Sequence, residues 1–140
     1  MRIRGVDAVA FVVAISEYDQ VLSDDLTSNR MHESINVFGQ ICCSRWFKTS
    51  PILLFMNKKD VFDEKIVYSP ISRCFPEYKV TGSSYDDSQY ILQKFRDQNQ
   101  YDREIYNHFT NAKDGKNINV IFGVIVDIIL HSNMDHLGME

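Results

Sequence analysis

The sequence predicts an α/β fold in which a mostly parallel sheet is flanked by helices. Val6–Ile15 is rich in apolar and β-branched residues, as expected for a strand that is covered on both faces. A second apolar run, Ile52–Met56, has the length of a strand. Segments with helical spacing of apolar residues alternate with these runs, and that alternation is typical of parallel sheets.

The first half of the chain continues with a polar loop over Ser16–Asp25 and a helix from about Thr27 to Ser44. Apolar residues recur in this helix at helical spacing, which predicts that they face the core: Met31, Ile35, Phe38 and Cys42. After the Ile52–Met56 strand, we expect a short helix over Asp63–Tyr68, ahead of Pro70.

In the second half, Ser84 with Asp87 three residues later resembles a capping box and opens a helix through about Gln98. Its predicted core face is Tyr85, Ile91, Leu92 and Phe95. Arg103–Phe109 is the third predicted strand. The segment from Lys116 to about Asn133 is rich in Val and Ile, which favours a strand, but its length and apolar spacing favour a helix packed on the sheet.

Length and composition describe one soluble globular domain. The 140 residues are 44% hydrophobic and carry a net charge of −4, so they bury one modest core. No basic stripe with interleaved aromatics is present, which argues against nucleic acid as a partner. Three cysteines, two of them adjacent, indicate reduced cytosolic thiols, and their spacing from the histidines does not suggest a zinc site. No signal peptide or transmembrane segment is evident.

The motif Asn57-Lys58-Lys59-Asp60 directly follows the second predicted strand. Ligands of open α/β sheets bind at the carboxyl ends of strands. Guanine presents an N1–H and a 2-amino group side by side, and an ionised Asp60 accepts from both, whereas adenine offers an acceptor at N1. Asn57 suits N7 and the neighbouring loop backbone, and the Lys58 stem suits the purine face. The same four residues also fit a solvated charged turn that closes a strand.

A second element supports the guanine interpretation. Phe109-Thr110-Asn111-Ala112-Lys113-Asp114 lies between the third predicted strand and the final helix. A backbone N–H at Ala112 would serve guanine O6, and the small side chain lets the backbone approach the ring. Alone, this stretch also fits an ordinary strand-to-helix connection. Together, the two motifs predict a guanine pocket that includes Lys59 and Thr110.

Several blocks of sequence resemble the α subunits of heterotrimeric G proteins, with the inhibitory/other (i/o) branch nearest. The blocks are Val13–Gln20, Asn29–Ser34, Trp46–Phe47, Asn57–Asp60, Cys74–Tyr78 and His108–Thr110. The resemblance runs from about Val6 to the C-terminus. It implies a Ras-like P-loop GTPase fold, with residues 1–140 as the C-terminal part of that domain, and a GTP/GDP switch that transduces signals from G-protein-coupled receptors.

The family's phosphate loop, Gly-x-x-x-x-Gly-Lys-Ser, has no match in this sequence. The arginine and glutamine that the family uses for hydrolysis, and the ligands of its Mg²⁺, are expected upstream of Met1. Because phosphoryl transfer depends on those groups, we expect the chain alone to be catalytically inactive and to bind GDP near millimolar affinity. The alternative is an inert interaction fragment that binds receptor or effector without nucleotide turnover.

The resemblance also assigns partner-facing residues. Trp46 and Phe47 correspond to an effector-facing loop, although an aromatic pair that anchors the loop to the core fits equally well. The receptor-facing tail is Leu137, Gly138, Met139 and Glu140. Glu140 stands where relatives carry an apolar residue, so we expect altered receptor coupling, because burial of an unpaired carboxylate is costly. The β/γ complex is a further implied partner, and the implied location is cytoplasmic, at the inner face of the plasma membrane for the intact family member.

Overall fold

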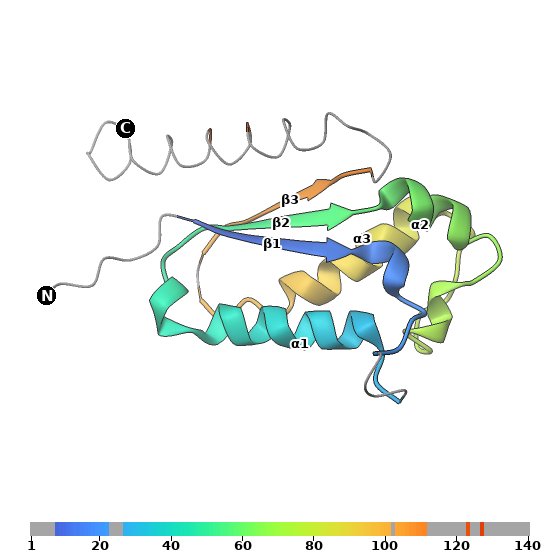
Figure 1. The fold of residues 1–140 in the computed structure, drawn as a ribbon, viewed down its shortest axis with the longest axis horizontal. Helices are drawn as coiled ribbons and strands as arrows, with labels where there is room; N and C mark the ends of the chain where they lie inside the picture. Colours follow the sequence, from blue (N-terminus) through green and yellow to red (C-terminus); the bar gives the residue numbers. More distant parts are fainter. Residues whose placement is uncertain (1–7, 23–26, 102, 112–122, 124–126, 128–140) are drawn as a thin grey trace, which may run out of the picture.

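The computed structural model describes residues 8–22, 27–101, 103–111, 123 and 127 of the chain. Within them, three strands form one sheet in the order β1-β2-β3, and both neighbouring pairs are parallel (Figure 1). The strands are β1 (Val9–Ala14), β2 (Ile52–Asn57) and β3 (Ile105–Phe109). The prediction of an α/β fold with a parallel sheet flanked by helices is confirmed.

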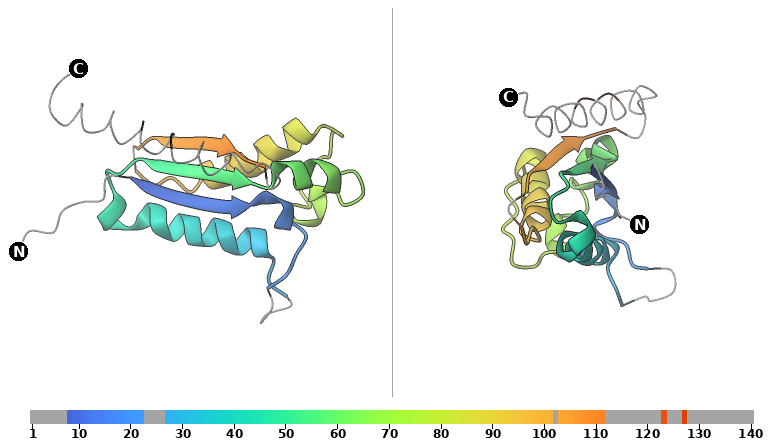
Figure 2. Two further views of the ribbon diagram at one scale, coloured as in Figure 1. Left: turned by 45° about the horizontal axis from the view of Figure 1, so that its top comes forward. Right: turned by 90° about the vertical axis from the view of Figure 1, so that its left-hand side faces the viewer.

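Three α-helices and three short 3-10 helices connect the strands in the described ranges. The α-helices are α1 (Arg30–Cys43), α2 (Lys59–Lys65) and α3 (Ser84–Arg96). The 3-10 helices are η1 (Ile15–Glu17), η2 (Arg45–Phe47) and η3 (Ile71–Arg73). Helices α1 and α3 lie side by side on one face of the sheet (Figure 2). Between them and the strands, Phe38 of α1 and Phe95 of α3 are fully buried, with ring centroids 5.5 Å apart.

The core face of α1 is as predicted. Met31, Ile35, Phe38 and Cys42 are all buried because they recur on one side of a 3.6-residue helix. The helix begins later than Thr27, however. Asn29 is its N-cap, and the Asn29 side-chain oxygen accepts from the backbone N–H groups of Met31 and His32 at 2.8 and 3.0 Å.

Two features of α3 correct the prediction. Its N-cap is Ser83 rather than Ser84, because the Ser83 hydroxyl accepts from the backbone N–H of Asp86. Tyr85 is 67% exposed, whereas Ile91, Leu92 and Phe95 are buried as predicted. Tyr85 stands two turns before Leu92 on nearly the same side of the helix, so its exposure follows from its place in the first turn of α3 and not from the helical period.

Other element boundaries differ from the predicted ones. The predicted helix over Asp63–Tyr68 is instead α2, which begins four residues earlier. Strand β1 ends at Ala14, and the predicted polar loop starts with η1, where Ile15, Ser16 and Tyr18 are buried. Strand β3 starts at Ile105 rather than Arg103, and α3 ends at Arg96. Of the predicted final helix, only Gly123 and Asp127 are described, and both are helical.

Candidate functional site

The two predicted guanine motifs meet at the carboxyl ends of β2 and β3. The register pairs Met56 with Phe109, so Asn57 and Thr110 follow on neighbouring strands. The backbone N–H of Thr110 donates to the Met56 carbonyl at 2.9 Å, and the Thr110 hydroxyl donates to Asn57 Oδ1 at 2.8 Å. Thr110 is 2% exposed, and Asn57 is half-buried. This contact fixes the Asn57 amide at the sheet edge, with its oxygen turned toward Thr110.

A single residue, Lys58, joins the end of β2 to the start of α2. Lys58 is the one non-glycine residue with positive φ in the described part of the chain, with φ of 63° and ψ of 37°. This left-handed conformation is disfavoured for side-chain-bearing residues and persists where surrounding contacts hold it. Here the Lys58 carbonyl accepts from the Phe62 N–H, and the Lys59 N–H donates to the Thr110 carbonyl, both at 2.9 Å. Helix α2 therefore starts at the sheet edge.

Asp60 lies in the first turn of α2 and is half-buried. One of its carboxylate oxygens accepts from the Val61 N–H at 2.9 Å. A carboxylate offers about four acceptor positions in all, which is what a base with two adjacent donors requires. Lys59 turns instead along the helix, where its Nζ lies 2.5 Å from Asp63 Oδ1. An amide, a lysine stem and a carboxylate are therefore gathered on one short turn, and these groups fit a purine with adjacent donors.

Some predicted site residues cannot be placed at this edge. Ala112, predicted to serve guanine O6 through its backbone, lies outside the described residues, as does the tail Leu137, Gly138, Met139 and Glu140. Among the described residues, no three His, Cys, Asp or Glu side chains gather as they would around a metal ion. No helix in the described ranges has the length and apolar character needed to cross a bilayer.

The aromatic pair Trp46–Phe47 lies at the other end of β2. The two residues belong to η2, which precedes Ile52, whereas Asn57 ends the strand. Trp46 is 52% exposed, and the Arg45 guanidinium lies 5.8 Å from its ring centroid. Phe47 is half-buried, and its carbonyl accepts from Arg103 Nη1 at 2.9 Å. Trp46 thus faces solvent while the Phe47 backbone is anchored, and both interpretations of the pair stay predictions.

Comparison with known families decides the identity at family level. The sequence matches the family model described as G-protein alpha subunit over residues 2–129. The chain belongs to the G-protein alpha subunit family. Members of this family generally bind GTP and GDP and act with receptors, β/γ complexes and effectors. The parallel sheet with α2 at its carboxyl edge is consistent with part of the Ras-like domain of such an α subunit.

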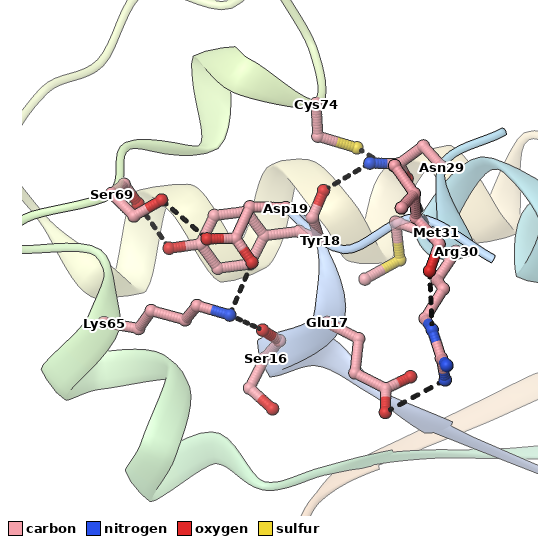
Figure 3. A network of polar contacts seen from close by, with 11 residues as sticks. Ser16, Glu17, Tyr18, Asp19, Asn29, Arg30, Met31, Lys65, Ser69 and Cys74 are labelled. Atoms are coloured by element: carbon pink, nitrogen blue, oxygen red, sulfur yellow. Dashed lines mark hydrogen bonds and ion pairs between the residues drawn. The ribbon is translucent and has the colours of Figure 1, made fainter. Parts of the chain in front are cut away.

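Sequence reasoning missed a polar network beside the site in this G-protein α-subunit chain (Figure 3). Lys65 at the end of α2 pairs with Asp19, and Lys65 Nζ donates to the Ser16 carbonyl at 2.9 Å. Ser69 donates from its hydroxyl to Asp19 Oδ2 at 2.7 Å and accepts at its carbonyl from the Tyr18 hydroxyl. The sequence signal was a tyrosine and an aspartate shortly after the first predicted strand, in a stretch interpreted as a polar loop.

Burial sets the electrostatics of this network. Desolvation raises the pKa of Tyr18 to about 12, despite the opposing hydrogen bond to Ser69. Desolvation also acts to raise the pKa of Asp19, but hydrogen bonds from Lys65 and Ser69 and the Lys65 charge outweigh it, so the pKa lies below its usual value. Tyr18 is therefore neutral and Asp19 ionised at neutral pH, opposite a cationic Lys65.

The cysteines and His32 have structural contacts. Cys42, Cys43 and Cys74 are free thiols. Burial raises the pKa of Cys74 to about 12, which disfavours the reactive thiolate. His32 Nε2 lies 2.7 Å from the Cys74 carbonyl, and its ring meets Phe75 edge-on with centroids 5.2 Å apart. This contact agrees with the interpretation of His32 as a surface or structural histidine.

Proposed function

We propose that the carboxyl edge of β2 and β3 recognises the guanine base of GDP or GTP. In this proposal Asp60 accepts from guanine N1–H and the 2-amino group, and the Asn57 amide serves N7. The Lys58 stem covers the purine face, and Ala112 donates to O6 through its backbone. Lys59 and Thr110 hold the turn. The observation that carries the proposal is the 2.8 Å hydrogen bond from Thr110 to Asn57, which joins the two base-recognition motifs.

The chemistry of these groups favours guanine over adenine. Hydrogen bonds to a charged acceptor contribute about 1.5–3 kcal/mol each. Adenine would place the N1 lone pair against the Asp60 carboxylate and leave an acceptor unpaired. A site built to accept two donors rejects a base that lacks them far more strongly than it rejects a change in size alone. When bound, the nucleotide supplies the γ-phosphate chemistry of the family switch, while Asn57, Lys58 and Asp60 hold and select the base.

Titration of the 140-residue chain by two-dimensional NMR with GDP and with ADP tests this proposal. We expect a dissociation constant of about 1 mM for GDP and one at least about tenfold higher for ADP. The chemical-shift changes should be concentrated at Asn57–Asp60. Asp60→Ala should abolish the preference. Asp63→Ala is the matched control, because it removes a carboxylate from the same helix, one turn away. Equal binding of GDP and ADP by the unaltered chain would refute the proposal.

At the level of the cell, we propose that the intact protein is an α subunit most similar to the i/o branch. It would transduce signals from a receptor at the inner face of the plasma membrane. The supporting features are the resemblance blocks and the family membership. Receptor contact is assigned to the tail Leu137–Glu140, and replacement of Glu140 by Phe in a full-length α subunit that ends in this tail should strengthen receptor-stimulated nucleotide exchange. Unchanged exchange would contradict this assignment.

A second candidate function is an interaction module that binds an effector without nucleotide turnover. Exposed Trp46, held over a backbone anchored by Arg103, favours it. Tryptophan is enriched among the residues that dominate binding energy at interfaces. If this function is the relevant one, Trp46→Ala should weaken effector capture while Asp60→Ala leaves it unchanged. Under the base-recognition function alone, the Trp46 variant should capture effector normally.

A further inference from the structure

Helix α2 carries Asp60 but is too short to hold its own orientation. It has seven residues, and isolated helices below about 12 residues are marginal in water. At its start it is tied to the residue after β3 by the Lys59–Thr110 backbone hydrogen bond. The direction in which α2 leaves this bond, and with it the placement of Asp60, depends on contacts made further along the helix.

The end of α2 is held by the segment that follows β1. Lys65 pairs with Asp19, donates to the Ser16 carbonyl at 2.9 Å, and has its Nζ 5.4 Å from the centroid of the Tyr18 ring (Figure 3). One turn earlier, Phe62 of α2 meets Tyr18 edge-on, with ring centroids 5.5 Å apart. Lys65 lies five residues beyond Asp60, which is about 7.5 Å along the helix axis. A shift at Lys65 would therefore be transmitted to Asp60.

The segment that follows β1, which contains Tyr18 and Asp19, is itself fixed by two further sets of contacts. The Asn29 side chain donates from Nδ2 to the Tyr18 carbonyl at 2.6 Å while its oxygen caps α1. The Tyr18 hydroxyl and the Asp19 carboxylate both bond to Ser69, which lies beyond α2. Tyr18 is fully buried, and the Lys65 and Asp19 side chains are 15% and 14% exposed. The network therefore has little room for rearrangement.

From this geometry we infer that Tyr18, Asp19 and Lys65 are positioning residues for guanine recognition, which aim the Asp60 carboxylate by fixing α2. The inference rests on the proposed base-recognition function. A buried ion pair contributes little net stability compared with well-packed apolar residues, because both charges lose hydration. Its contribution here is a defined arrangement of α2.

The test compares GDP with inosine diphosphate, whose base lacks the 2-amino group and so loses one of the two contacts to Asp60. The ratio of the two dissociation constants reports whether the Asp60 carboxylate is placed to accept from the 2-amino group. A variant that merely unfolds part of the population weakens both nucleotides equally and leaves the ratio unchanged. We expect the unaltered 140-residue chain to favour GDP by roughly tenfold in NMR titrations, and Lys65→Met to lower that ratio by about threefold or more.

Lys94→Met is the matched control. Lys94 also forms an ion pair, with Glu77 at 3.3 Å, and lies over aromatic rings, but it belongs to α3. We expect this variant to keep the GDP preference of the unaltered chain. If Lys65→Met and Lys94→Met both keep the full ratio, the positioning inference is wrong while base recognition stands. If the unaltered chain shows no preference, or Asp60→Ala keeps it, the proposed function itself fails.

The double variant Asp19→Asn/Lys65→Met separates positioning from stability. Removal of both charges avoids the cost of one buried, unpaired charge, so the double variant should unfold at a higher urea concentration than Lys65→Met. Its ratio of dissociation constants should nevertheless stay low, because the end of α2 has then lost the Lys65 contacts to Asp19 and to the Ser16 carbonyl. Recovery of the full ratio in the double variant would show that the pair acts through stability alone and would overturn the inference.

Discussion

The two ends of β2 are fixed in a similar way but expose different groups. At the carboxyl end, Thr110 after β3 reaches across and bonds to the Asn57 side chain. At the amino end, Arg103 before β3 reaches across and bonds to the Cys42 and Phe47 carbonyls. The first contact fixes the side chain that we propose to bind guanine N7, whereas the second fixes backbone and leaves the neighbouring Trp46 side chain in solvent. One end therefore suits a small polar ligand and the other suits a partner surface.

Substitution at the amino end should have the largest effect on stability. Arg103→Met removes charge-assisted hydrogen bonds to two backbone carbonyls, and such bonds contribute about 1.5–3 kcal/mol each. Because Arg103 is only half-buried and water partly screens its bonds, we expect less than their sum, a loss of about 2–3 kcal/mol in the free energy of unfolding measured with urea. The preference for GDP over ADP should be unchanged. A lost GDP preference in the folded variant would show that the two ends are not independent.

Thr110→Val should have a smaller effect on stability and a larger one on binding. The substitution keeps the shape of the buried side chain but removes the hydroxyl that donates to Asn57. We expect a loss of about 1 kcal/mol in urea unfolding, with weakened GDP binding by NMR titration. Thr49, an exposed threonine at the other end of β2, provides the matched control as Thr49→Val. Unchanged GDP binding by Thr110→Val would show that the Thr110–Asn57 hydrogen bond is not needed for base recognition.

Contacts in and beside the candidate site were easier to predict from the sequence when a local pattern marked both contacting residues. The meeting of Asn57 and Thr110 was predictable, because Asn57 follows the second predicted strand, Thr110 follows the third, and parallel strands end at one edge. The start of α2 was misplaced because Lys58 is left-handed without being a glycine, and no local pattern marks that conformation. The bonds of Tyr18 and Asp19 to Ser69 and Lys65 join residues about fifty positions apart, so only the folded chain reveals them.

The carboxyl end should also respond to alkaline pH. The pKa of Tyr18 rises from 10.0 to about 12 on folding, so the folded state holds the phenol proton more tightly than the unfolded state does. The stability it contributes is full below pH 10 and is lost as pH rises toward about 12. Tyr78 acts in the same window, with its pKa also raised to about 12. Between about pH 9 and about pH 11, the urea midpoint of unfolding should fall less in Tyr18→Phe than in the unaltered chain. A part of the fall should remain, because Tyr78 still titrates in this window. An identical fall in the variant would contradict the assignment to Tyr18.

The smallest effect is expected at Trp46. Trp46→Ala removes an exposed side chain that rests beside Arg45, and surface substitutions of this kind change stability by less than about 0.5 kcal/mol. Thermal unfolding and GDP titration should both match the unaltered chain. A loss above about 1 kcal/mol would mean that Trp46 anchors its loop to the core and is not presented to a partner.

The account depends most on the contact between Asp60 and the purine, and Asp60→Asn tests it most directly. Xanthine carries a carbonyl where guanine has its 2-amino group, and the amide of the variant can donate to that carbonyl. NMR titration of the unaltered and Asp60→Asn chains with guanosine and xanthosine diphosphates should therefore show the preference reversed, by about tenfold or more in each direction. A variant that still prefers guanosine diphosphate would contradict the assignment of Asp60 as the residue that selects the base.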